Sequence, residues 1–212
     1  MNRAASRFAC LFAAAFAAGS AFAQAPAPGT TTTAAWAGAV QLFKADLDDG
    51  GDAETTGLFA GVNVGHQFTR VLNVGLTLRY AYEDWTFGDP VAFGGVAPWN
   101  RVQRPGIGLP TTWAFDDSTR LLINPQIEWA YENGASSSDA KNYGAIVALS
   151  KTFSRDLTLG IGAGVFEEID DTKVIPVVII DWRFAPGWRL GNPLPAGPAG
   201  GAGLEIEYQP ND

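Results

Sequence analysis

The chain has 212 residues, of which 47% are hydrophobic, and a formal net charge of −8. This length suits either one domain with a sizeable core or one small membrane barrel. Nucleic acid is not an expected partner, because an acidic chain lacks the clustered Lys and Arg that bind phosphates.

Residues 1–23 have the features of a secretory signal peptide: two arginines, the short apolar run Phe8–Ala18 and a small-x-small cleavage pattern. The apolar run is too short to span a bilayer, which takes about 20 residues. We therefore expect export and cleavage after Ala23. Cleavage removes the sole cysteine, Cys10, and changes the net charge from −8 to −10, because the segment carries two arginines and no acid.

Residues 24–34 are mostly Pro, Ala and Thr without periodicity, and we expect a flexible leader on the periplasmic side. No later stretch is apolar over the roughly 18 residues that a membrane helix needs. The only other architecture that satisfies every backbone group inside lipid is a closed β-barrel.

Residues 35–212 alternate apolar and polar side chains with the period of two that indicates strands. The clearest case is Leu72–Glu83, in which the even-numbered apolar residues share one face. Pro105 and Pro110 weaken one strand, since proline removes a ladder donor. The pattern predicts ten strands, namely Ala35–Ala45, Thr56–Phe68, Leu72–Glu83, Val102–Phe115, Thr119–Tyr131, Asn142–Phe153, Leu157–Phe166, Lys173–Phe184, Trp188–Asn192 and Ala202–Gln209.

The segments between these strands differ at the two ends. Turns at one end are short, and those at the other are long and often acidic, as in Asp46–Glu54, Asp84–Arg101 and Asn133–Lys141. Aromatic residues gather near strand ends on the apolar face, as in the girdles of outer-membrane barrels. The set beside the short turns is Phe68, Phe115, Phe153, Phe184 and Tyr208, and the set toward the long loops is Tyr80, Tyr82, Trp129, Tyr131 and Tyr143.

We therefore expect an all-β, antiparallel, up-and-down transmembrane β-barrel over residues 35–212. The alternative is a soluble β-sandwich or lipocalin-like barrel, with the apolar face turned into a core. Ten is an even number of strands and could close by itself. The chain could instead be part of a barrel of roughly 12 or more strands, because it ends Tyr208-Gln209-Pro210-Asn211-Asp212 rather than on a terminal aromatic.

The export signal, the hairpins that end on aromatics and the segment Asp181–Gly200 (DWRFAPGWRLGNPLPAGPAG) together resemble a family of uncharacterised Gram-negative outer-membrane β-barrels of unknown function. The resemblance implies a location in the outer membrane and a barrel fold. It implies no catalytic or ligand-binding residue.

Several charged residues are expected on the face opposite the apolar one, inside the barrel. They could line a polar pore that selects solutes by charge, or form ion pairs that fill a narrow lumen. These residues are Arg79, Glu83, Arg104, Glu128, Asp181, Arg183, Glu205 and Glu207.

Three other motifs could suggest metal binding, catalysis or phosphate binding, but we expect none of these functions. The acidic segment Asp46–Glu54 departs from the calcium-loop pattern at Gly50 and lacks its bidentate Glu, so we expect a plain loop and no metal site. The only histidine, His66, is expected on the lipid side near the short turns, where no catalytic role follows. The glycines of Gly160–Gly164 have strand spacing and no following helix, which indicates relief of crowding rather than a phosphate loop.

The expected function is passive, porin-like transport of small solutes, without enzyme activity or cofactor. The alternative is a structural or surface-interaction barrel whose acidic extracellular loops contact lipopolysaccharide, cations or other cells. Expected partners are outer-membrane lipid, lipopolysaccharide and, during insertion, the barrel-assembly machinery. The sequence leaves the oligomeric state open.

Overall fold

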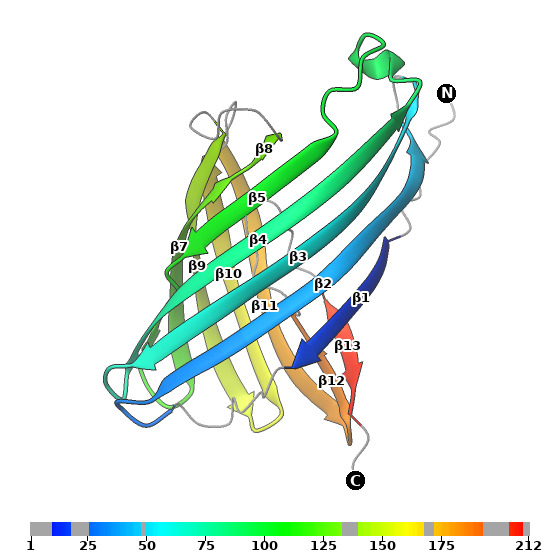
Figure 1. Cartoon of the computed structure of the whole chain (residues 1–212). Helices are drawn as coiled ribbons and strands as arrows, with labels where there is room; N and C mark the ends of the chain where they lie inside the picture. Colours follow the sequence, from blue (N-terminus) through cyan, green and yellow to red (C-terminus); the bar gives the residue numbers. More distant parts are fainter. Residues whose placement is uncertain are drawn as a thin grey trace.

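A computed structural model describes residues 10–17, 26–47, 50–132, 140–167, 172–192 and 204–209. The described chain is all-β and forms one antiparallel up-and-down sheet, with a single short 3-10 turn at Val91–Phe93 (Figure 1). The sheet order is β1-β2-β3-β4-β5-β7-β9-β10-β11-β12-β13; β6 pairs with β4 and β7, and β8 pairs with β5. The all-β, antiparallel up-and-down class expected from the sequence is confirmed.

Each of the ten predicted strands overlaps one or two strands of the structure, but the first predicted strand begins at Thr31, within the predicted leader 24–34. The strands are β1 (Cys10–Ala17), β2 (Thr31–Asp46), β3 (Asp52–Gln67), β4 (Leu72–Gly88), β5 (Arg101–Gly108), β6 (Thr111–Ala114), β7 (Thr119–Trp129), β8 (Tyr131–Glu132), β9 (Lys141–Ser154), β10 (Leu157–Glu167), β11 (Thr172–Ala185), β12 (Trp188–Gly191) and β13 (Glu205–Tyr208).

The fourth and fifth predicted strands are each split in two. The prediction of one continuous strand over residues 102–115 was wrong, because β5 and β6 are separated at Leu109 and Pro110. Pro110 has no amide hydrogen to donate to the ladder, although its carbonyl still accepts a 2.7 Å hydrogen bond from the Gly75 amide. The break between β7 and β8 falls at Ala130, whose amide bonds to the carbonyl of Ala140 at 2.9 Å.

Strands extend into two of the predicted loops, Asp46–Glu54 and Asp84–Arg101. β2 and β3 pair as far as Asp46 and Asp52, and β4 continues to Gly88, opposite Asp52. Acidic and glycine residues are depleted in strands, which is why the sequence indicated loops here. Continued pairing between three long neighbouring strands overrides that local preference. The predicted loops at 133–141, 167–172 and 193–201 lie mostly outside the described residues.

β1 lies within the predicted signal peptide. It pairs antiparallel with β2, from Cys10 opposite Leu42 to Ala17 opposite Ala35. An edge strand offers a row of free backbone donors and acceptors, and any extended segment can satisfy them. β1 therefore occupies the edge of β2 that does not pair with β3.

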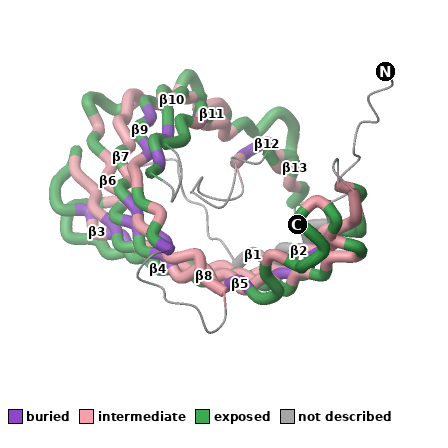
Figure 2. Tube along the Cα trace, turned by 90° about the horizontal axis from the view of Figure 1, so that it is seen from above, coloured by how far each residue is buried: buried purple, intermediate pink, exposed green. Residues whose placement is uncertain are grey.

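The two faces of the sheet differ in how far their side chains are exposed. The sheet curls around a central space (Figure 2), and the apolar residues of the alternating pattern lie on its exposed face, which we call the outer face. Leu78 is 45% exposed, Val147 46% and Ile161 73%. The intervening positions, on what we call the inner face, include Ala148 and Phe166 at 1% exposure.

Part of the inner face carries an apolar cluster on β9, β10 and β11. Phe166 is fully buried against Ile146 and Val177, with Ile175 and Ile179 packed beside them. A Cβ atom at Gly164 would lie 2.6 Å from the ring of Phe166, so the glycine leaves the space that the ring occupies. The glycines of β10 thus relieve crowding between neighbouring strands, and no helix follows them.

We predict that Asp116, in the turn between β6 and β7, titrates well below a normal aspartate. Its pKa falls from 3.8 to about 2, because the Ser118 hydroxyl and the Ser118 and Thr119 amides donate to its carboxylate. Since the folded pKa lies below the unfolded one, the ionised carboxylate stabilises the turn above about pH 4, and this is lost as the pH falls toward 2.

Carboxyl NMR titration of the folded chain in micelles measures this pKa. Ser118→Ala removes the hydroxyl donor and is expected to move the Asp116 midpoint back toward 3.8. A wild-type midpoint already near 3.8, or one that Ser118→Ala leaves unmoved, contradicts the prediction.

Candidate functional site

The candidate site is a set of charged side chains on the inner face of β4, β5 and β7. Arg79 on β4, Gly106 on β5 and Glu128 on β7 lie opposite one another in a single row across three strands. A Cβ atom at Gly106 would lie 2.6 Å from Nε of Arg79 and 3.0 Å from its Cγ. The absence of a side chain at Gly106 therefore lets Arg79 cross β5 and reach Glu128.

Glu128 is the centre of the group and is only 3% exposed. Its Oε2 lies 3.4 Å from Nη2 of Arg79, and its Oε1 lies 3.5 Å from Nη1 of Arg104. Both arginine side chains are themselves more than three-quarters buried, at 21% and 24% exposure. A buried carboxylate of this kind persists only when it is paired, because an isolated charge away from water is costly.

The ion pairs and hydrogen bonds extend from Glu128 to further residues on the inner face. Nε of Arg104 lies 2.9 Å from Oε1 of Glu83, whose Oε2 accepts a 2.9 Å hydrogen bond from the indole of Trp85. At the other end, Nη1 of Arg79 donates to the side-chain oxygen of Gln126 at 2.7 Å. Two arginines and two glutamates thus form one charge-balanced network.

A second group lies on the inner face of β11, β12 and β13. Arg189 joins Asp181, at 2.8 Å, to Glu207, at 3.4 Å. Glu205 shares the face of Glu207, two residues earlier on β13. Carboxylates outnumber the single arginine here, so this part of the wall is acidic.

The structure brings most of the predicted interior charges together. Arg79, Glu83, Arg104 and Glu128 meet in the first network, and Asp181 and Glu207 meet in the second, with Glu205 nearby. Arg183 instead lies exposed toward the turn after β11, and none of the described ion pairs includes it.

Three members of these networks were missed from the sequence. Trp85 was assigned to a loop, although it keeps the odd-numbered spacing of Arg79 and Glu83. Gln126 is neutral and was not considered as a partner. Arg189 follows Trp188 in the predicted strand Trp188–Asn192. Because Trp188 is on the apolar face and successive side chains point to opposite faces, the alternation would have placed Arg189 on the inner face.

Five predicted girdle aromatics share the end of the sheet with the short turns. All five are exposed, from 42% for Phe184 to 62% for Phe153. Trp182, Phe184, Trp188 and Tyr208 form a chain of ring contacts between 4.7 and 6.2 Å. The residues of this end are Phe68, Phe115, Phe153, Phe184 and Tyr208, joined by Trp113, Trp182 and Trp188.

The second aromatic set lies toward the longer connections. Tyr82, Gln103 and Tyr131 stand in one row across β4, β5 and β8, and the hydroxyl of Tyr80 donates to Gln103 at 3.0 Å. Tyr80 and Tyr143 are exposed on the outer face, whereas Tyr82, Trp129 and Tyr131 are half-buried.

His66 contacts a hydroxyl and an aromatic ring near the short turns. Nδ1 of His66 lies 2.9 Å from the Thr31 hydroxyl, and its ring packs edge-on against Phe68 at 4.7 Å. Among the described residues, no three His, Cys, Asp or Glu side chains are grouped to hold a metal ion. None of the helices in the described part of the chain is long and apolar enough to cross a membrane.

Comparison of the chain with protein-family models, with curated proteins and with solved structures gives no match. The likeness of Asp181–Gly200 to an outer-membrane family therefore stays a prediction.

Removing the central carboxylate should destabilise the chain strongly. Glu128→Ala leaves two largely buried arginines without their shared partner, and we expect the free energy of unfolding to fall by about 3 kcal/mol. Urea unfolding in micelles, followed by tryptophan fluorescence, measures the change.

Glu207→Ala is the matched control, since it also removes one glutamate that pairs with an inner-face arginine. The Glu207 side chain is 35% exposed, so its loss should cost less than about 1 kcal/mol. Equal losses for the two variants would show that burial of Glu128 does not govern the network.

Proposed function

We propose that the chain is an integral outer-membrane β-barrel that lets small solutes pass, with its apolar outer face against lipid. The observation that carries the proposal is the exposure of the apolar face. Leu58, Ile161 and Ile206 are at least 60% exposed, while Glu128 is almost fully buried on the opposite face. A soluble β-protein would turn the apolar face into its core, whereas a membrane barrel faces lipid with it.

The height of the apolar band supports a membrane location. On the outer face of β4, Leu72 and Tyr82 are ten residues apart, which corresponds to roughly 26 Å of height at the usual rise and strand tilt. The apolar band of outer-membrane barrels is about 25 Å tall. Beyond Tyr82 the same face continues with Asp84 and Thr86, which suit water.

The direction of the strands allows a closed barrel of ten strand positions. β2 runs away from the short-turn end and β13 runs toward it, so a pairing between them would be antiparallel like every other in the sheet. Cleavage of the expected signal peptide would remove β1 and free the edge of β2. We propose that this edge pairs with β13, or with further strands if the barrel is larger.

The charged inner wall suits a passage for small polar solutes. The arginines and glutamates lie on the inner face, opposite the apolar outer face. Solutes that pass close to them would be selected by charge. Phe166 and the other apolar side chains of β9 to β11 occupy a different part of the inner face. A lumen narrowed by both groups would pass only small solutes.

A role in surface interaction is the second candidate. It is favoured by apolar side chains beyond the row of Tyr82, in the connection between β4 and β5. Val96 is 71% exposed, Phe93 42% and Trp99 38%. Such side chains in a loop on the outer side of the membrane would contact lipopolysaccharide or another cell surface.

Membrane location predicts that one outer-face substitution is costly and another is tolerated. Leu76→Arg places a charge near the middle of the apolar band, and we expect it to cost about 2–4 kcal/mol. Thr86→Arg lies on the same face of the same strand beyond Tyr82, and we expect a cost of at most about 1 kcal/mol. Urea titration of the chain folded into phospholipid vesicles measures both.

In a water-soluble protein, both exposed positions would accept arginine within about 0.5 kcal/mol. A free energy of unfolding that Leu76→Arg leaves unchanged would therefore refute the lipid-facing outer face.

Passage of solutes predicts ion conductance in planar lipid bilayers. Arg79→Ser combined with Glu128→Ser removes two long side chains from the lumen and leaves the Arg104–Glu83 pair in place. We expect this double variant to have a larger single-channel conductance than the wild type. Absence of conductance from both proteins would refute the passage and leave the outcome of the Leu76→Arg experiment unaffected.

A further inference from the structure

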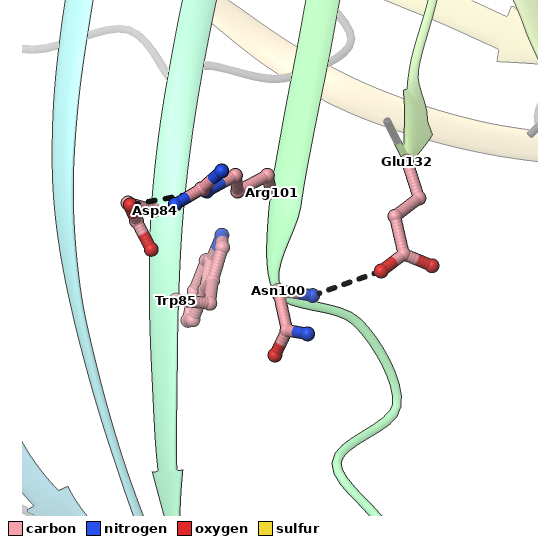
Figure 3. Close-up of a pocket in the computed structure, with 5 residues that line it drawn as sticks. All are labelled: Asp84, Trp85, Asn100, Arg101 and Glu132. Atoms are coloured by element: carbon pink, nitrogen blue, oxygen red, sulfur yellow. Dashed lines mark hydrogen bonds and ion pairs between the residues drawn. The ribbon is translucent and has the colours of Figure 1, made fainter. Parts of the chain in front are cut away.

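A hollow of about 370 Å³ lies at the end of the sheet opposite the short turns. Its lining comes from the end of β4, the start of β5 and β8 (Figure 3), and consists of Asp84, Trp85, Asn100, Arg101 and Glu132. Each of these residues stands just beyond the row of Tyr82, Gln103 and Tyr131. The hollow is therefore outside the apolar band, where it opens to water.

The walls of the hollow are held by direct contacts. The amide of Trp85 donates to the carbonyl of Asn100 at 2.7 Å, and the amide of Asn100 donates to Oε1 of Glu132 at 3.2 Å. The indole nitrogen of Trp85 also donates a hydrogen bond to Glu83, which belongs to the ion-pair network of the inner face. The lining is thus preorganised on strand ends rather than on a free loop.

Two polar side chains of the lining keep hydrogen-bonding capacity for a ligand. Arg101 and Asp84 face each other at 3.6 Å, and their side chains are 58% and 49% exposed. A long contact between exposed groups is weak. It leaves guanidinium donors and carboxylate acceptors that can turn toward a bound molecule.

An aromatic platform adjoins the hollow. Trp85 is stacked parallel to Phe87 at 6.0 Å and meets Trp99 edge-on at 6.2 Å, and Phe93 contacts both Phe87 and Trp99. The exposed faces of such rings are favourable surfaces for weakly polarised C–H groups.

The lining selects a class of ligand by elimination. Two carboxylates repel an anion, and the guanidinium of Arg101 repels a metal ion. An apolar ligand would leave the carboxylates and the amide without hydrogen bonds. A neutral polyhydroxylated ring can donate to Asp84 and accept from Arg101, which face each other at 3.6 Å.

We propose that this hollow binds one saccharide unit. Its volume is within the range of about 300–1,000 Å³ found for small-molecule sites. The sugar could be a free oligosaccharide approaching the lumen, or part of a polysaccharide carried by the cell surface. Both sources offer the same hydroxyl groups, and the experiment distinguishes them.

The experiment uses the full chain folded in lauryldimethylamine oxide, a detergent that carries no sugar. Maltose and N-acetylglucosamine are titrated as free probes, and deacylated lipopolysaccharide core oligosaccharide as the surface probe, with calorimetry and tryptophan fluorescence as readouts. We expect saturable binding of at least one probe. Preference for the free sugars would indicate a solute, and preference for the core oligosaccharide a surface ligand; both support the site.

Asp84→Ala combined with Arg101→Ala is expected to weaken binding about tenfold or more, the loss of one or two charge-assisted hydrogen bonds. Lys44→Ala combined with Asp52→Ala is the matched control. It removes another ion pair, 2.7 Å long, at the end of β2 and β3, and binding should be unchanged.

Trp85→Phe keeps an aromatic ring and should retain calorimetric binding while its fluorescence change is lost. No binding of any of the three probes, or equal weakening by both double variants, would overturn the proposal. Because the titration is made in micelles, its outcome is independent of insertion into lipid and of conductance.

Discussion

A continuous antiparallel backbone ladder from β2 to β13 is the constraint on which the rest of the structure depends. Side chains alternate between the two faces of a strand, and residues that pair across the ladder have their side chains on the same face of the sheet. The apolar residues of the alternating pattern consequently collect on the outer face, whereas the charged networks, the glycines and the apolar cluster around Phe166 lie on the inner face. A slip of one residue anywhere would move charges such as Glu128 to the outer face.

Glycine determines how the inner wall is filled. Gly106 allows Arg79 to cross a whole strand and reach Glu128, and the ring of Phe166 occupies the space that a side chain at Gly164 would need. The ion network and the hollow beyond it are joined by Trp85, whose indole is bonded to Glu83 and whose amide is bonded to Asn100. The proposed solute passage and the proposed sugar site are therefore connected through this tryptophan.

The strand positions were predictable because alternation is a local property that survives in a single sequence. Its failures have identifiable causes. Pro110 breaks a strand that the hydrophobic alternation predicts as continuous. The acidic residues near Asp52 are in a strand because β2 and β4 extend alongside β3 and pair with it there. The alternation predicted which charged residues lie on the inner face. It did not predict which of them form ion pairs, since Arg79 and Glu128 are 49 positions apart in the sequence.

By itself, the sequence determined where most of the strands lie, which face of most of them is apolar, and which charges share the opposite face. These depend on the period-two geometry of an extended chain. Only the tertiary structure decided that the apolar face is the exposed one, that Glu128 joins two arginines, and that Asp84, Trp85 and Glu132 surround one hollow. Those features depend on sheet curvature and on contacts between strands distant in sequence, which no local pattern encodes.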